Sequence, residues 1–224
     1  MTLQVDPGML RRFSAEIVET SQLLAETDVS TPFADSQDAL ARTEFQQVAE
    51  LACGAAALGI ECVPVDAREP GDMPVGTALL PGWVEVPPEV FPFAYQVLVN
   101  EANTKGGWAP NAVLLHSRMS GHIDVEKLLA CAFVDSRRLP SWRENQTSTA
   151  DFLGRRSAFV SGSYVVATDT SEPLTLEATT RYVVTEMDAG QYLTQLTVTI
   201  RVSQHEDLEI DVTVMNLALT IGAS

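Results

Sequence analysis

The histidines, one serine motif and the neighbouring carboxylates are the side chains in this sequence that could perform acid–base, nucleophilic or metal chemistry. His116 and His122 are six positions apart and lack a carboxylate at helical spacing, so we do not expect a metal site there. Ser161 lies in Ser-Gly-Ser-Tyr, which is not the Gly-x-Ser-x-Gly pattern of a nucleophile elbow. Asp207 and Glu209 are typical of a solvated surface. With no phosphate loop or dinucleotide motif either, the sequence predicts a protein that is not an enzyme and uses no cofactor.

Two tryptophans and one arginine pair are the candidate ligand-binding residues. Trp108 stands in GGWAPNAVLLHSR, where a loop enters an apolar run, and it either plugs the core or lines a groove for an acyl chain or a sugar. We favour the plug, and Trp142, near a proline, faces the same choice with packing favoured. Arg155 and Arg156 either bind an anionic headgroup or, as we favour, offset acidic neighbours such as Asp151.

The charge balance narrows the class of partner. The chain has 224 residues, a net charge of -16 and an isoelectric point near 4.4. Such a surface repels phosphate backbones, so we do not expect nucleic-acid binding. The opening residues contain no apolar signal segment, and the longest apolar-rich run, residues 51–60, is too short to span a bilayer.

The first quarter of the chain is predicted to form an antiparallel helical hairpin, residues 1–62. Asp6 and Pro7 are a good start for a helix over residues 6–27, and a second helix follows over residues 36–58 after Thr31-Pro32. Each helix has an apolar stripe that a lone hairpin cannot bury. We therefore expect a protein partner for it, or contact with the rest of the chain.

The rest of the chain is predicted to be a linker, residues 63–76, followed by an α+β domain, residues 77–224. A strand pair, Thr77–Leu80 with Trp83–Val86, is expected around Pro81-Gly82. Longer strands are expected over Phe93–Asn100, Ala112–Arg118, Phe159–Thr168, Leu174–Val184 and Gln191–Val202, the last two joined by a turn at Asp188-Ala189-Gly190.

Helices complete the prediction for this domain. Asp124 is the expected cap of a helix that runs to about Arg138. Residues 208–219 fit a strand or a helix, and the acidic start at Glu206 favours the helix. Alternation in QYLTQLTVTI gives one apolar and one polar face, which is typical of an antiparallel sheet covered on one side.

Between Leu80 and Ile221 the chain contains, in this order, the segments PGWVEVPPEVFPFAYQVLV, APNAVLLHSRMSG, DSRRLPSW, TADFLGRRSAFVSGSY, LEATTRYVV and GQYLTQLTVTI. Together these segments resemble the LpqN/LpqT family of actinobacterial envelope lipoproteins. The resemblance implies a Mog1p/PsbP-like α-β-α sandwich with an antiparallel sheet and no enzymatic activity. It also implies a role in cell-envelope biogenesis, with mycolate- or trehalose-lipid-like ligands and contact with membrane lipid transporters.

The hairpin stands where the family has a signal peptide and an anchoring cysteine. TLQVDPGMLRRFSAEI resembles EspC-type hairpins of type VII secretion, although the turn has Thr31-Pro32-Phe33 in place of Trp-x-Gly and no Tyr-x-x-x-Asp/Glu signal follows. Location in the cytoplasm and export by such a route both stay open. We expect a non-catalytic binding protein of the envelope or secretion machinery; the alternative is a cytoplasmic adaptor that self-associates through its hairpin.

Overall fold

An antiparallel sheet forms the centre of the protein in the computed structural model, which describes residues 61–66, 73–91, 94–105, 108–166 and 173–222. The neighbouring strands are, in spatial order, β3 (Val84–Glu85), β4 (Gln96–Val99), β5 (Asn111–Met119), β9 (Gly190–Arg201), β8 (Leu174–Met187), β7 (Ser157–Val166) and β6 (Arg143–Ser148). A further strand, β1 (Cys62–Pro64), pairs with the end of β5. A separate two-stranded sheet joins β2 (Val75–Gly76) to β10 (Thr220–Ile221).

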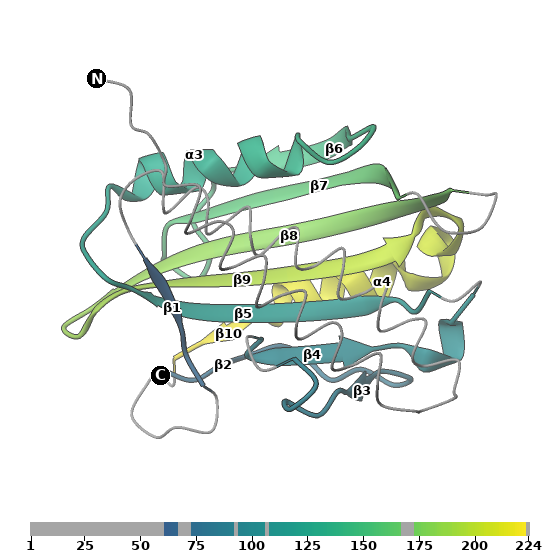
Figure 1. Cartoon of the computed structure of the whole chain (residues 1–224), viewed down its shortest axis with the longest axis horizontal. Helices are drawn as coiled ribbons and strands as arrows, with labels where there is room; N and C mark the ends of the chain where they lie inside the picture. The colour runs from purple at the N-terminus through teal and green to yellow at the C-terminus, as the bar shows by residue number, and fades with distance from the viewer. Residues whose placement is uncertain (1–60, 67–72, 92–93, 106–107, 167–172, 223–224) are drawn as a thin grey trace, which may run out of the picture.

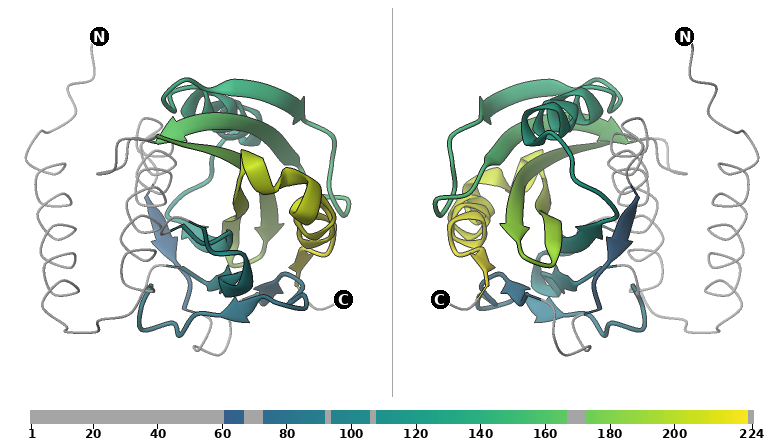
Figure 2. Two further views of the ribbon diagram at one scale, coloured as in Figure 1. Left: turned by 90° about the vertical axis from the view of Figure 1, so that its right-hand side faces the viewer. Right: turned by 90° about the vertical axis from the view of Figure 1, so that its left-hand side faces the viewer.

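Two helices cover opposite faces of this sheet. In Figure 1, α3 (Val125–Ser136) lies beside β6 and β7, whereas α4 (His205–Leu217) passes behind the central strands toward β10. Leu129 of α3 packs in one buried cluster with Leu193, while Met215 of α4 packs in another with Leu196. Since positions 193 and 196 of a strand point to opposite faces, the described elements form helix, sheet and helix layers. Short 3₁₀ turns, η1 (Glu101–Asn103) and η2 (Val202–Gln204), complete the described helices, and Figure 2 shows the layers end-on.

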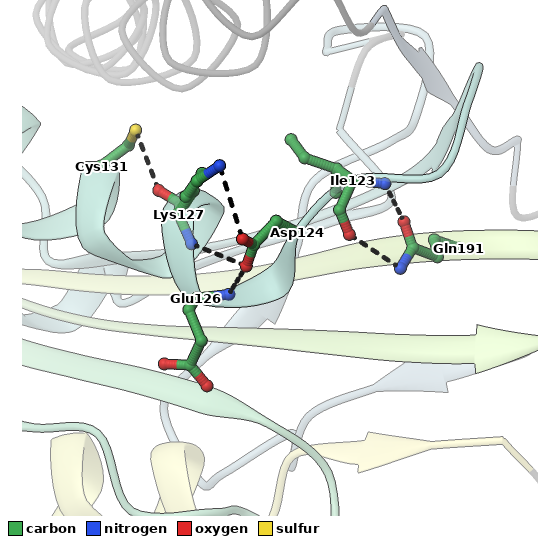
Figure 3. A network of polar contacts seen from close by, with 6 residues as sticks. All are labelled: Ile123, Asp124, Glu126, Lys127, Cys131 and Gln191. Carbon is green, nitrogen blue, oxygen red and sulfur yellow. Dashed lines mark hydrogen bonds and ion pairs between the residues drawn. The ribbon is translucent and has the colours of Figure 1, made fainter.

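The start of α3 is fixed by two polar side chains. Asp124 Oδ1 accepts hydrogen bonds from the backbone N–H groups of Glu126 and Lys127, at 3.1 and 3.4 Å. Gln191, at the start of β9, accepts from the N–H of Ile123 at 2.8 Å and donates to its carbonyl at 3.2 Å (Figure 3). The cap that the sequence predicts is therefore confirmed, and the amide of Gln191 ties the helix start to the sheet.

The polar face of β9 is buried, so the expectation of a sheet covered on one side is wrong. Gln195 and Thr197 are each 2 % exposed. Their polar groups bond to one another within the sheet: Gln195 Nε2 donates to Thr197 Oγ1 at 3.1 Å, and Thr197 shares a 3.2 Å hydroxyl contact with Thr180. A strand can bury polar side chains in this way because the hydrogen bonds offset their desolvation.

Short strands near the N-terminal end of the domain pair differently from the prediction. Val84–Glu85 pairs with Val99 and Leu98 of β4, rather than with Thr77–Leu80, which forms no strand. The turn at Pro81-Gly82 is present, with Gly82 at a φ of 85° and the N–H of Trp83 bonded to the carbonyl of Leu80. A tight turn makes a hairpin only when both flanking segments are extended and in register.

The predicted linker contributes to the folded domain. Over the described part of residues 63–76, β1 adds to the main sheet and β2 pairs with β10. Val65, Met73 and Val75 are buried in the cluster that includes Met215. Apolar side chains in a Pro/Gly-rich stretch therefore pack onto the core here, and the domain begins before residue 77.

The long elements agree with the prediction. All five strands predicted as long are present, although the one expected over Phe93–Asn100 is only Gln96–Val99, and the six-residue β6 was not predicted. The helix after Asp124 and the hairpin turn before Gly190 are also present, and the ambiguous C-terminal segment is the helix α4. The resulting α+β architecture with an antiparallel sheet is the expected one. The predicted N-terminal hairpin lies outside the described residues.

Candidate functional site

A groove of about 400 Å³ lies between α4 and the neighbouring part of the sheet. Its floor comes from alternate positions of β8, with neighbours on β6, β7 and β9, and its wall comes from α4. The lining side chains are Asn145, Gln146, Phe159, Ser161, Glu177, Thr179, Arg181, Ile200, His205, Glu209, Val212, Thr213, Asn216 and Leu217.

The polar floor follows from the period of two along β8. Glu177, Thr179 and Arg181 point to the face that α4 partly covers, and the sheet register places Ser161 and Phe159 of β7 opposite Thr179 and Arg181. Four intervals of about 3.3 Å separate Glu177 from Arg181, so the acidic and basic ends of the floor lie about 13 Å apart.

Arg181 forms the basic end of the groove. Its guanidinium carbon lies 4.3 Å from the ring centre of Phe152 and 5.0 Å from that of Phe159, so two aromatic faces hold it in place. Its Nε is buried and has no hydrogen-bond acceptor among the described residues. Burial lowers the pKa of Arg181 from its ordinary value. The group stays a cation at neutral pH, with donors that no described side chain occupies.

The opposite end of the groove is acidic. His205 Nδ1 lies 2.9 Å from Glu177 Oε2, and its Nε2 lies 3.9 Å from Glu209 Oε2. His205 is only half-buried, with 44 % of its side chain exposed, and Glu209 is 67 % exposed. A histidine that bridges two carboxylates at a groove rim can donate hydrogen bonds or hold a charge.

Apolar side chains line the space between these ends. Phe159 and Ile200 rise from the sheet, and Val212 and Leu217 face them from α4, where Leu217 is 64 % exposed. Asn216 also lines the groove, and its Oδ1 is buried without a donor in the described chain. This mixture suits an elongated ligand that has both an apolar part and hydrogen-bonding groups.

Trp108 lies away from this groove, in a closed apolar cluster. It is 2 % exposed and packs with Leu139, Tyr164, Leu174 and Leu176 on the α3 side of the sheet. The sequence left open whether Trp108 plugs the core or lines a groove, and the structure places it in the core. Its indole N–H has no acceptor among the described residues.

Trp142 is partly buried between two core clusters and packs over Gly162 of β7. A Cβ added to Gly162 would lie 2.6 Å from the carbonyl oxygen of Arg143 and would clash with the Trp142 ring. The tryptophan thus has a packing role that depends on a glycine at the strand beneath it.

Arg155 and Arg156 line a different hollow, of about 810 Å³, beside the β8–β9 turn. Arg156 forms ion pairs with Glu126 and, at 3.2 Å, with Asp151, which confirms the expected pairing. Arg155 Nη2 donates to the carbonyl of Ile221 at 3.1 Å. Both side chains have structural partners, and neither joins Trp108 or Trp142 in one site.

The structure separates the histidines considered for chemistry. His116 is 1 % exposed, stacks on Tyr192 with ring centres 5.3 Å apart, and contacts Thr194 Oγ1 at 3.0 Å through Nδ1. His122 is exposed in the loop before α3. The described residues hold no group of three metal-ligating side chains.

Sequence reasoning missed Arg181 as a site residue. The signal was present in LEATTRYVV, where Glu177, Thr179 and Arg181 alternate with apolar or small residues in a strand otherwise suited to a core. A charged residue at such a position is rarely buried without a partner. Its aromatic neighbours, however, come from residues more than twenty positions away, so only the fold shows that it is enclosed.

Comparisons with known proteins agree with the described architecture. The family model described as "Probable lipoprotein LpqN" matches residues 55–222, well over half of the chain. A solved structure described as LpqN involved in cell envelope biogenesis of Mycobacterium tuberculosis has a TM-score of 0.63 and 21 % identity, and it covers 73 % of this chain and 92 % of its own. At that identity the likeness shows the fold.

Curated relatives include the proline-rich 28 kDa antigen of Mycobacterium tuberculosis, 29 % identical over 124 residues, which are 55 % of this chain and 38 % of the antigen. The homologous antigen of Mycobacterium leprae is 29 % identical over 122 residues, covering 54 % of this chain and 42 % of its own. The chain thus spans about two fifths of the length of these relatives. None of the described helices is long and apolar enough to cross a bilayer.

Proposed function

This chain belongs to the LpqN family, and from that premise we propose that it is a non-catalytic binding protein of the actinobacterial cell envelope. We propose further that the groove beside α4 holds a lipid or glycolipid. The observation that carries this proposal is the groove itself, which combines apolar walls with a polar floor. A ligand with an acyl chain and a hydroxyl-bearing head has the matching chemistry.

The family and the fold support the envelope part of this proposal. The LpqN protein with the similar fold is described as involved in cell envelope biogenesis of Mycobacterium tuberculosis. For this chain the same setting is an inference, and contact with a membrane-transport partner would fit it as well. Fractionation of the tagged full chain in an actinobacterial host tests it: we expect the protein in the envelope fraction, and retention in the cytosol alone would contradict the envelope role.

Ligand binding is tested by filling the groove from its helical wall. Thr213 lines the groove and is exposed, whereas the next residue, Val214, does not line it. We expect Thr213→Trp to lower the affinity of the full chain for a neutral amphiphile, dodecyl maltoside, about tenfold or more, because the indole occupies the space of the ligand. Val214→Trp is the matched control and should bind as the unmodified chain does. Equal binding by both variants would place the ligand elsewhere.

A further inference from the structure

We propose that the ligand of the groove is anionic, and that Arg181 binds its phosphate or carboxylate oxygens. This inference deepens the proposed function and rests on it, because it names the chemical group that the groove selects.

Arg181 differs from the other arginines that the fold partly buries. In the described residues these are Arg155, Arg181 and Arg201. Arg155 donates to the carbonyl of Ile221 at 3.1 Å, and Arg201 donates to that of Lys105 at 2.7 Å. Arg181 has no such acceptor within the described chain, and its Nε is buried. A partly buried guanidinium with open donors is costly to keep unless something binds it.

The surroundings of Arg181 favour an anion over a neutral group. The rings of Phe152 and Phe159 hold the guanidinium plane in place, so little side-chain entropy is lost when a ligand binds. Nε is enclosed, and because Arg181 lines the groove, its two terminal nitrogens are the donors that we expect a ligand to reach. Burial lowers the pKa of Arg181, and no carboxylate among the described residues offsets this effect. Phosphate and carboxylate oxygens are the acceptors that match such a fork.

The acidic end of the groove limits where the negative charge can sit. Glu177 and Glu209 flank His205 about 13 Å from Arg181, as judged from the strand spacing. A second anionic group at that end would meet like charges, whereas hydroxyl groups could donate to the carboxylates. The groove therefore fits an amphiphile with one anionic group at Arg181 and hydroxyl groups toward Glu177.

Titration calorimetry of the full chain with three probes tests this proposal: dodecyl phosphate, dodecyl maltoside and inorganic phosphate, each amphiphile below its micelle concentration. We expect dodecyl phosphate to bind about tenfold to a hundredfold more tightly than dodecyl maltoside, the range for a hydrogen bond to a charged group. Arg181→Gln should remove this preference, and Arg181→Lys should keep part of it because the charge remains without the planar fork.

Arg156→Gln is the matched control, because Arg156 pairs with Asp151 at the surface and does not line the groove. Circular dichroism of Arg181→Gln is the control for folding, and we expect the spectrum of the unmodified chain. If both amphiphiles bind equally and Arg181→Gln changes neither, the anion site is refuted while groove binding stands. If none of the three probes binds, both proposals fail. Binding of inorganic phosphate alone, lost in Arg181→Gln, would support the anion site and identify its source as a free anion, against a lipid ligand.

Discussion

The cluster around Trp108 and the groove around Arg181 are built on the same strand, yet they differ in every other respect. Leu176 and Ala178 of β8 face the Trp108 cluster, whereas Thr179 and Arg181 face the groove. The Trp108 cluster is closed and apolar, whereas the groove holds charge, hydroxyl groups and open volume. Strand alternation thus separates a stabilising surface from a binding surface within a few residues, and a tryptophan that could serve either purpose falls on the stabilising one.

The largest effect expected from this comparison is at Trp108. Trp108→Ala should lower the free energy of unfolding by about 3–5 kcal/mol, because it leaves a cavity in a closed cluster. Urea denaturation of the full chain measures it, with Leu153→Ala, at a residue 56 % exposed, as the control with little change. Unchanged stability with lost amphiphile binding would instead make Trp108 a groove wall.

A substitution at Gly162, which lies against the ring of Trp142, tests how tightly this tryptophan is packed. Gly162→Ala should cost about 1–3 kcal/mol of unfolding free energy, because the added methyl meets the indole and the carbonyl of Arg143. Thermal denaturation gives the comparison with Ser163→Ala, the next residue on β7, for which we expect a smaller change. A stable Gly162→Ala variant would mean that Trp142 moves aside easily and is not fixed by packing.

Arg181 should behave in the opposite way from Trp108. Arg181→Met keeps an unbranched side chain between the two phenylalanines and removes open donors, so stability should change by less than about 1 kcal/mol or rise. Amphiphile binding, measured on the same samples, should lose its preference for the anion. A loss of several kcal/mol in Arg181→Met would show that the arginine has a structural role, which would break the contrast between the two regions.

The surface ion pair of Arg137 and Glu144 should contribute the smallest of these effects on stability. Their Nε–Oε2 distance is 2.8 Å, and the hydrogen bond from Arg137 lowers the pKa of Glu144. A carboxyl with a lowered folded pKa stabilises the protein above its unfolded pKa, and that stability is lost as the pH falls through the folded value. Because both side chains are partly exposed, Glu144→Gln should cost no more than about 1 kcal/mol at neutral pH and nothing in acid. A loss that persists in acid would rule out the ion pair as its cause.

Much of the fold could be predicted from the sequence because its long elements carry strong local signals. Strand β9 alternates over many residues, Asp124 caps α3 directly, and the acidic first turn of α4 favours a helix over a strand. Strands of two or three residues carry no such signal, since their pairing depends on which neighbour lies in register. For that reason the predicted pairing partner of Val84–Glu85 was wrong. The sequence also did not predict that Val65 and Val75 pack in the core.

The candidate site was less predictable, for a physical reason that its residues illustrate. Trp108, Arg155 and Arg156 are conspicuous by residue type, but burial among distant side chains or pairing with Asp151 explains them. Arg181 is inconspicuous within its strand, and its importance arises from the absence of an acceptor around it in the described structure.

By itself, the sequence determined the periodic strands, the helix α3 with its Asp124 cap, the helix α4 with its acidic first turn, and the family to which the chain belongs. These features depend on the local pattern of residues and on the order of the segments along the chain. The tertiary structure decided which polar residues are satisfied and which are open. The hydroxyl of Thr197 contacts that of Thr180 across two paired strands, whereas Arg181 contacts two aromatic rings and pairs with no carboxylate of the described residues. Such differences depend on contacts between segments far apart in the chain, which no local pattern encodes.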